Sequence, residues 1–153
     1  MKRKNYISEY LSDESLAKIV DSISEIEKKT SGEIRVCLKK KTDFRQRKKN
    51  PREIALKEFY KSGMHNTKDR TGILLFVIFD EHKFEILADE GIDSKISPEI
   101  WKELTGELRS YFKNEKYLDG ILSGLNKLGK ILIEEFPISP GDKNELSNEI
   151  LTG

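Results

Sequence analysis

The sequence predicts one α/β domain in which a small mixed β-sheet is covered by helices on both faces. The strongest observation is an uninterrupted apolar run, Ile73–Phe79, which is typical of a central strand buried on both sides. The second is a pair of alternating segments, 33–38 and 84–88, which have the two-residue period of half-buried strands. The third is a set of about four segments with apolar residues at three- and four-residue spacing, which indicates amphipathic helices.

Length and composition exclude several classes of protein. A chain of 153 residues fits a single domain, and its formal net charge of +1 gives no global field to attract nucleic acid. The only cysteine, Cys37, excludes an intrachain disulfide framework and a cysteine-rich zinc site. No secretory signal is apparent, and no run approaches the ~20 apolar residues of a membrane helix. We therefore expect a cytoplasmic protein with no transmembrane segment and no organic cofactor.

The chain divides into three predicted parts. Residues 1–11 form a polar arm, residues 12–137 form the domain, and residues 138–153 form an acidic tail. The first helix of the domain begins at Ser12 and runs to about Lys29, with acids in its first turn and lysines in its last. Both kinds of charge suit the helix dipole at those ends.

The connections between the strands predict their directions. A helix over about 51–62, begun by the cap Asn50 and by Pro51, lies between strand 33–38 and strand 72–79. A strand–helix–strand connection of this kind makes the two strands parallel and the crossover right-handed. Residues 80–83 are too few for a helix, so strand 84–88 returns antiparallel.

Two more helices follow the sheet. Ser97-Pro98 begins one of them by the same combination of cap and proline. Residues 114–116 separate it from the last helix, which runs from about Tyr117 to Glu135. The apolar stripes of both helices predict that they pack on the sheet.

The segment 39–52 is strongly basic and supports two interpretations. Its candidate anion-binding residues are Lys39, Lys40, Arg45, Arg47 and Lys48. One interpretation is a loop that docks an anionic membrane surface or nucleic acid. The other is a solvated loop that its like charges keep extended. Phe44 is the only aromatic residue of the segment, so the signal for nucleic acid is not strong.

The predicted topology gathers polar residues at one edge of the sheet. If the first two strands are parallel, Glu33 and the loop 65–70 lie where those strands begin. The third strand returns to that edge and brings Asp89 and Glu90. The basic segment and the hairpin 80–82 then lie at the opposite edge.

The gathered residues allow three hypotheses. In the first, oxygen ligands for a hard divalent cation such as Ca²⁺ come from Glu33, Asp69, Asp89 and Glu90, with Asp93 nearby. In the second, Arg70 binds a phosphate or carboxylate together with His65, Thr67 and the backbone amides of the helix start at Ser97. In the third, Arg70 pairs with Asp89 or Glu33 and the turn merely closes the sheet.

Several short motifs together resemble one protein family. They are Ser31-Gly32-Glu33-Ile34-Arg35-Val36, Gly63-Met64-His65 with Thr67 and Arg70, Gly72-Ile73-Leu74, Lys83-Phe84-Glu85-Ile86, Asp89 with Gly91-Ile92, Trp101, Phe136-Pro137, and Asn144-Glu145-Leu146. In this order they resemble the TPM domain family, in its stand-alone soluble bacterial branch. The sequence departs from the family pattern at Thr71 and Ala88, which flank the proposed edge site, and at Glu81 of the hairpin.

The resemblance implies a fold and a choice of functions. The fold is a three-layer α/β/α sandwich with a small mixed sheet. The function is phosphatase-like or calcium-binding, at the edge formed by Glu33, Arg70, Asp89 and Glu90. In a phosphatase the catalytic candidates are Arg70, Asp89 and His65, and the partner is a phosphorylated substrate. The alternative is a non-catalytic interaction module that docks a membrane-associated protein or an anionic membrane surface through segment 39–52.

Overall fold

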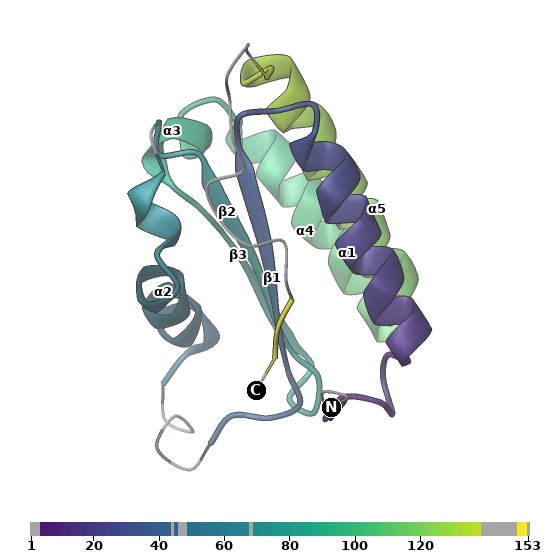
Figure 1. Cartoon of the computed structure of the whole chain (residues 1–153). Helices are drawn as coiled ribbons and strands as arrows, with labels where there is room; N and C mark the ends of the chain where they lie inside the picture. Colours follow the sequence, from purple (N-terminus) through teal and green to yellow (C-terminus); the bar gives the residue numbers. More distant parts are fainter. Residues whose placement is uncertain (1–3, 44, 46–48, 68, 139–149, 153) are drawn as a thin grey trace.

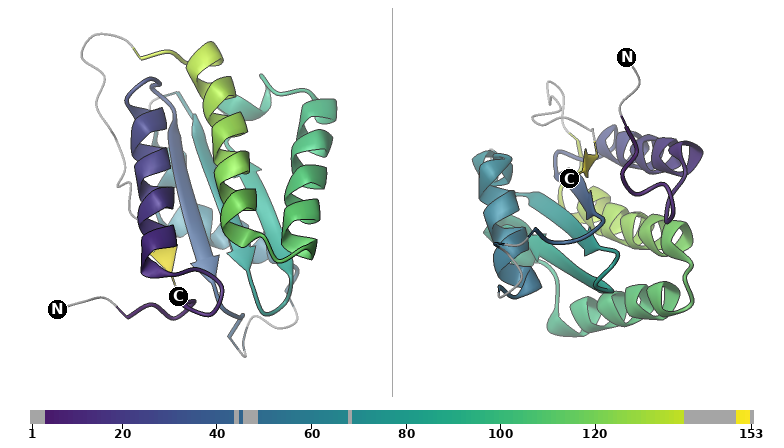
Figure 2. Two further views of the ribbon diagram at one scale, coloured as in Figure 1. Left: turned by 90° about the vertical axis from the view of Figure 1, so that its right-hand side faces the viewer. Right: turned by 90° about the horizontal axis from the view of Figure 1, so that it is seen from below.

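The computed structural model describes residues 4–43, 45, 49–67, 69–138 and 150–152. The helices and strands of this part of the chain follow in the order α1 (Asp13–Glu27), β1 (Glu33–Lys39), α2 (Pro51–Lys61), the 3₁₀ turn η2 (Met64–Asn66), β2 (Gly72–Ile78), β3 (Lys83–Ala88), α3 (Glu90–Asp93), α4 (Pro98–Lys113), α5 (Tyr117–Glu135) and β4 (Leu151–Thr152). The arrangement has three layers. Helix α2 covers one face of the sheet, and α1, α4 and α5 cover the other (Figures 1 and 2).

The sheet has the strand order β3-β2-β1-β4 within the described residues. β1 lies parallel to β2 with Glu33 opposite Gly72, and β2 lies antiparallel to β3 with Ile73 opposite Ala88. The predicted parallel pair, the antiparallel return strand and the α/β fold class are therefore confirmed. β4 is an addition to the prediction: it pairs parallel with Cys37 and Leu38 of β1.

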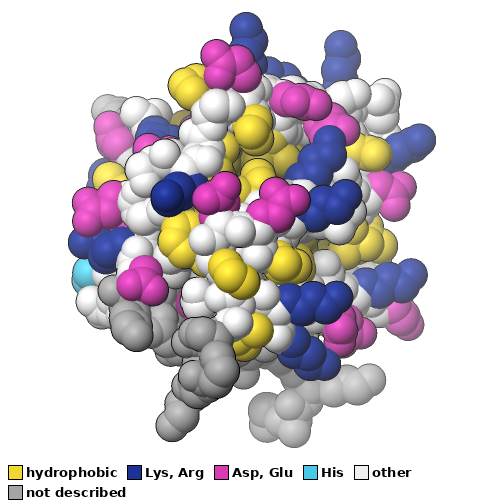
Figure 3. All heavy atoms as spheres, turned by 90° about the horizontal axis from the view of Figure 1, so that it is seen from above, with side chains coloured by type: hydrophobic (Ala, Val, Ile, Leu, Met, Phe, Trp, Pro, Cys, Tyr) yellow, Lys and Arg dark blue, Asp and Glu magenta, His cyan; other side chains and the backbone are white. Residues whose placement is uncertain are grey.

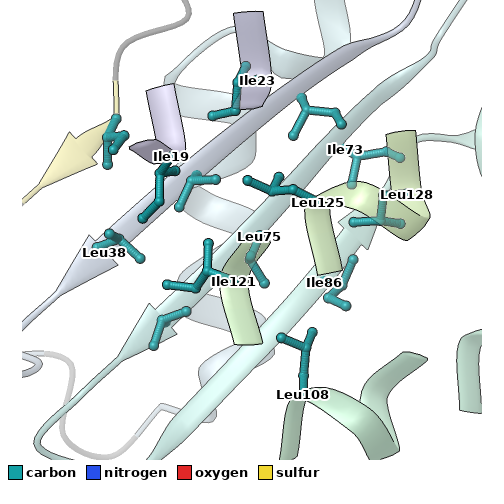
Figure 4. Close-up of a cluster of buried hydrophobic side chains, with 14 of the residues drawn as sticks. Ile19, Ile23, Leu38, Ile73, Leu75, Ile86, Leu108, Ile121, Leu125 and Leu128 are labelled. Atoms are coloured by element: carbon teal, nitrogen blue, oxygen red, sulfur yellow. The ribbon is translucent and has the colours of Figure 1, made fainter. Parts of the chain in front are cut away.

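Two apolar clusters hold the layers together, one on each face of the sheet. β2 is buried along its whole length, and its residues alternate between the clusters. The larger cluster joins the sheet to α1, α4 and α5, and Figure 4 shows Leu75 of β2 among Ile121 and Leu125 of α5. The smaller cluster packs Phe76 against Ile54 and other residues of α2. Burial on both faces accounts for the continuous apolar run of this strand.

The arm that the sequence marks as polar contributes to the core. Ile7 and Leu11 are buried, because a turn brings both of them into the larger cluster. Tyr10 stacks on Phe79 with 4.6 Å between ring centroids, and its hydroxyl donates a hydrogen bond to Asp80. The arm is therefore fastened to the hairpin end of the sheet.

Most of the predicted acidic tail, residues 139–149, lies outside the described residues. Its last part returns to the sheet, where Ile150 is buried in the larger cluster next to β4. Among the helices of the described residues, none combines the length and the apolar character needed to cross a bilayer.

Candidate functional site

The structure brings the predicted edge residues to one end of the sheet. The Glu33 N–H donates to the Thr71 carbonyl at 3.3 Å, which places the start of β1 beside the start of β2. The Asp89 N–H donates to the Gly72 carbonyl at 2.9 Å, which places the end of β3 there as well. Figure 3 views the molecule from this side, where acidic and basic side chains are interspersed rather than segregated.

Arg70 and Asp89 form the centre of this edge. The Arg70 Nε donates to Asp89 Oδ2 at 2.6 Å, and Arg70 Nη1 lies 3.7 Å from Glu90 Oε1. The other oxygen of Asp89 accepts the Glu90 N–H at 2.8 Å, as the cap of the short helix α3. The hydrogen bond to Asp89 raises the pKa of Arg70. The Asp89 side chain is 6% exposed and the Arg70 side chain 41% exposed, so a buried carboxylate orients a guanidinium that solvent can reach.

The backbone of Arg70 is in an unusual conformation. Its φ of 55° lies in the left-handed region that few residues other than glycine adopt. The Arg70 N–H donates to the Thr67 carbonyl, and the Gly91 N–H donates to the Arg70 carbonyl at 2.9 Å. The Thr67 hydroxyl also accepts the Thr71 N–H. These bonds fix the loop, and Thr67 contributes both its carbonyl and its hydroxyl to them.

Gly91 allows this close approach of α3 to the loop. A Cβ atom at Gly91 would lie 2.1 Å from the Asp69 carbonyl oxygen and 2.6 Å from the Arg70 carbonyl oxygen. No side chain fits in such a space without movement of the backbone. Asp69 therefore contributes its carbonyl group to this contact, while the residue itself is exposed.

Glu33 pairs with a residue that none of the three hypotheses includes. It is 2% exposed and forms a buried carboxyl pair with Glu27, at the end of α1. Burial, and then the hydrogen bond and charge of Glu33, raise the pKa of Glu27 to about 9. Glu27 also accepts the Ile34 N–H at 3.5 Å, on the free side of β1. Glu27 therefore satisfies an edge amide of the strand and holds a proton beside Glu33.

Met64 separates Glu33 from Asp89. Gly72 lies between the two acids in the sheet, and a Cβ atom on it would lie 2.7 Å from the Met64 carbonyl oxygen and 3.3 Å from its methyl carbon. Met64 is fully buried and fills this space. In the part of the chain that the structure describes, no group of three or more His, Cys, Asp and Glu side chains is arranged to hold a metal ion. The arrangement does not fit the predicted calcium cage, and the calcium site stays a prediction.

Tyr60 lies beside His65, and the sequence did not predict it as a residue of this region. The rings of Tyr60 and His65 lie 4.9 Å apart, and Tyr60 adds a small contribution to the raised pKa of Arg70, of which the hydrogen bond to Asp89 is the main cause. The Nδ1 atom of His65 is buried and has no hydrogen-bond partner among the described residues. A signal for Tyr60 exists in the sequence, because it lies one turn before the glycine that ends α2.

The basic segment lies at the opposite end of the sheet, as expected. Asp80 donates its N–H to the Lys40 carbonyl, and the Thr42 N–H and hydroxyl donate to Glu81, so the segment is bound to the hairpin. Lys40 pairs with Glu9, and Arg45 is exposed. Arg47 and Lys48 lie outside the described residues. An anion-binding role for this segment stays a prediction.

Cys37 is expected to be unreactive in the folded protein. It is 1% exposed in the smaller cluster, and burial raises the pKa of its thiol to about 12. Because the thiolate is the reacting form, a thiol reagent should modify the native chain at least ~100-fold more slowly than the chain in denaturant. Equal rates measured by mass spectrometry in the two states would contradict the buried position.

Comparison with known protein families identifies the family of this chain. The family model described as the TPM domain matches residues 7–131. The chain belongs to the TPM domain family. The match includes the whole edge from Glu27 to Gly91, so the carboxyl pair and the Arg70 loop are parts of a TPM domain.

Solved structures agree with this assignment. The TPM domain described here is similar to the NMR structure of the BA42 protein from the psychrophilic bacterium Bizionia argentinensis, with 32% sequence identity, a TM-score of 0.84 and coverage of 99% of each chain. It also has the fold of the N-terminal domain of a P. gingivalis protein, with 17% identity, a TM-score of 0.66 and coverage of 83% of this chain and 79% of that chain. No curated protein sequence matches the chain.

Proposed function

We propose that the edge around Arg70 binds the phosphate group of a phosphorylated ligand and hydrolyses its ester, which is the phosphatase-like function that membership of the TPM family suggests. The observation that carries the proposal is the left-handed backbone of Arg70, held by Thr67 and Gly91. A conformation of this kind costs about 1–3 kcal/mol and is concentrated at binding and catalytic sites. Pairing with Asp89 alone would not need it, because a long arginine side chain has many routes to a nearby carboxylate.

Arg70 has the chemistry for the phosphate group. Asp89 occupies Nε and Glu90 lies 3.7 Å from Nη1, so a phosphate would approach the Nη side of a guanidinium that is 41% exposed, next to Glu90. A planar guanidinium can donate two parallel hydrogen bonds to phosphate oxygens. Both oxygens of Asp89 are already engaged, so its role is to position Arg70.

Glu90 is the best-placed base for hydrolysis. Its side chain is 76% exposed, and its carboxylate lies 3.7 Å from Arg70 Nη1. From there it can accept a proton from a water molecule that attacks the phosphorus of an ester bound by Arg70, while the P–O bond to the alcohol breaks and the leaving alcohol takes a proton from solvent. His65 lies against Tyr60, and we assign it no step in the hydrolysis. We assign no step to a divalent cation either, because the acids of the edge do not form a ligand set among the described residues.

Hydrolysis of p-nitrophenyl phosphate tests the proposal. We expect Arg70→Ala and Glu90→Gln each to lower kcat/KM by about 100-fold, as is usual when a phosphate-binding group or a general base is removed. Lys95→Ala is the control, because Lys95 is exposed just beyond α3 and should leave the rate unchanged. Each protein is assayed with and without added calcium.

The assay separates catalysis from binding. Equal rates in the wild-type protein, Arg70→Ala and Glu90→Gln would end the phosphatase proposal. Titration with inorganic phosphate, followed by amide NMR shifts around residues 69–72 and 89–91, then tests binding alone. No shift at these amides would remove the phosphate site as well.

A further inference from the structure

The edge strand β3 leaves backbone groups without partners. Residues of an antiparallel pair alternate between hydrogen-bonded and non-hydrogen-bonded positions. The Asp89 N–H donates to the Gly72 carbonyl, so these two residues are a hydrogen-bonded pair. It follows from the register that Phe84, Ile86 and Ala88 direct their N–H and C=O groups away from β2. Within the described residues, no hydrogen bond reaches these groups. An edge of this kind is a template for another strand.

A groove runs along this free edge. It has a volume of about 950 Å³ and lies between β3 and α4, with the start of α2 at its rim. In Figure 2, α4 stands beside β3 at the margin of the sheet. Its apolar lining combines aliphatic residues of β2 and β3 with aromatic residues that include Phe84, Trp101, Phe112 and Tyr117. The groove therefore offers apolar contacts next to the free backbone groups.

Helix α4 presents a separate face to the groove. Leu104 and Leu108 are buried in the larger core cluster, and α4 packs on α5. Trp101, Thr105 and Arg109, spaced one turn apart, line the groove and remain at least partly exposed. The Trp101 Nε1 donor is buried and has no hydrogen-bond partner among the described residues. The core thus uses Leu104 and Leu108, Trp101 packs against the core at the edge of the groove, and the adjoining positions Thr105 and Arg109 remain available.

The charges of the groove give it a direction. The rings of Phe84 and Phe112 lie 5.4 Å apart, so the start of β3 lies beside the end of α4. This end of the groove is therefore basic, with Lys83, Arg109 and Lys113 and one acid, Glu115. Asp93 lies at the other end. Of the remaining charged lining residues, Arg52 pairs with Glu85. His82 adjoins the basic end.

We propose that this groove binds an extended peptide segment of a partner protein, which adds to β3 as an antiparallel strand. Its backbone pairs with Phe84 and Ile86, and its alternate apolar side chains contact the apolar lining. Because an antiparallel segment ends beside the start of β3, its carboxyl-terminal part is acidic and meets Lys83, Arg109 and Lys113. A basic residue at its other end meets Asp93.

Two features favour a peptide over a second copy of the chain. The volume of the groove suits a ligand rather than a domain. One wall of the groove is α4, and a second copy that paired through β3 would bring its own α4 against this wall. A peptide brings a single strand. The groove also lacks Arg70, Asp89 and Glu90 in its lining, so the proposal is independent of the phosphate site.

The test uses synthetic peptides of the form KTΦTΦTE, in which Φ is Val, Ile, Leu or Phe. The matched controls are the charge-reversed peptides ETΦTΦTK and peptides with proline at the second Φ position, which lack a backbone donor there. Trp101 is the only tryptophan of the chain, so its fluorescence reports occupancy of the groove. Amide hydrogen exchange gives a second readout.

We expect KTΦTΦTE to bind at least about fivefold more tightly than ETΦTΦTK, since two or three exposed charge pairs contribute roughly 1 kcal/mol together. Bound peptide should slow exchange at the amides of Phe84 and Ile86, while those of Glu85 and Leu87 already face β2. The double variant Arg109→Glu and Lys113→Glu should prefer ETΦTΦTK. Lys102→Glu, an exposed change on the same helix outside the groove, should keep the original preference.

Three results would overturn the proposal. The first is no fluorescence change with any KTΦTΦTE peptide. The second is equal binding of the proline peptides, which would exclude strand pairing. The third is a concentration-dependent dimer that protects the same amides without peptide, which would assign the edge to a second copy of the chain.

Discussion

Gly91→Ala is expected to destabilise the protein by about 3 kcal/mol, at the upper end of what overpacking usually costs. The new Cβ atom would lie 2.1 Å from the Asp69 carbonyl oxygen and 2.6 Å from that of Arg70, and both are backbone atoms that cannot rotate away. Relief requires α3 to move from the loop, which breaks the bond from the Gly91 N–H to the Arg70 carbonyl. For a domain of this size the loss corresponds to a fall in Tm of roughly 6–12 °C in thermal unfolding.

Gly106→Ala is the matched control. Gly106 lies inside α4, and a Cβ atom there meets nothing within 4 Å. Alanine in an exposed helix position stabilises by about 0.5–1 kcal/mol relative to glycine, so Tm should rise slightly. A Gly91→Ala protein as stable as the wild type would show that the approach of α3 to the Arg70 loop is not tight.

The same variant links the fold to the proposed function. Movement of α3 shifts Asp89 and Glu90 away from Arg70, because Asp89 caps this helix. If part of the Gly91→Ala protein remains folded, we expect that this fraction does not bind phosphate. It should then behave like the Arg70→Ala variant. Retained binding would mean that the left-handed backbone of Arg70 is not needed for the site.

The gathering of the edge residues could be predicted because it depends on chain connectivity. The helix between strands 33–38 and 72–79 implied a parallel pair, and the four-residue turn at 80–83 implied a return strand. These two inferences are sufficient to bring Glu33, Arg70 and Asp89 to one end of the sheet, as observed. Neither inference needs a side-chain position.

The partners of these residues depend on packing and could not be predicted. Met64 looks like an ordinary residue after a helix-ending glycine, yet it fills the space over Gly72 and keeps Glu33 from Asp89. Glu27 looks like a surface acid in the last turn of a helix, yet it is 9% exposed and pairs with Glu33. Ile7 and Leu11 have a four-residue spacing, but the charged and polar residues around them indicate an exposed segment, and their burial could not be predicted.

The buried pair Glu27–Glu33 predicts that the protein becomes less stable as the pH rises. The pKa of Glu27 is raised in the folded state to about 9, whereas a carboxyl group in the unfolded chain has its ordinary value, 4.5. Between these values the folded state holds a proton that the unfolded state has released. The free energy of unfolding therefore falls with pH, at a slope of up to about 1.4 kcal/mol per pH unit. The stabilisation is complete below about pH 4.5, and it is lost as the pH rises through the pKa of Glu27 in the folded state.

Glu27→Gln should remove this dependence of the unfolding free energy on pH. The difference from the wild type is large because the pH range between the two pKa values of Glu27 includes neutral pH. The amide is uncharged in both states, it can still accept the Ile34 N–H, and it can donate to Glu33. Urea unfolding at pH 6 and pH 8 should show a loss of roughly 2–3 kcal/mol in the wild type and a much smaller loss in the variant. Glu25→Gln in the same helix is the control and should keep the wild-type slope, because Glu25 is exposed and pairs with Lys28.

Equal slopes in all three proteins would mean that the pair does not share a buried proton. Calcium provides a separate test of the same site, because a cation bound between the two carboxylates would replace the shared proton. If Glu33 were a calcium ligand, millimolar calcium would abolish the slope in the wild type. We expect the slope to persist, since Met64 separates Glu33 from Asp89 and the pair alone is too few ligands for a calcium site.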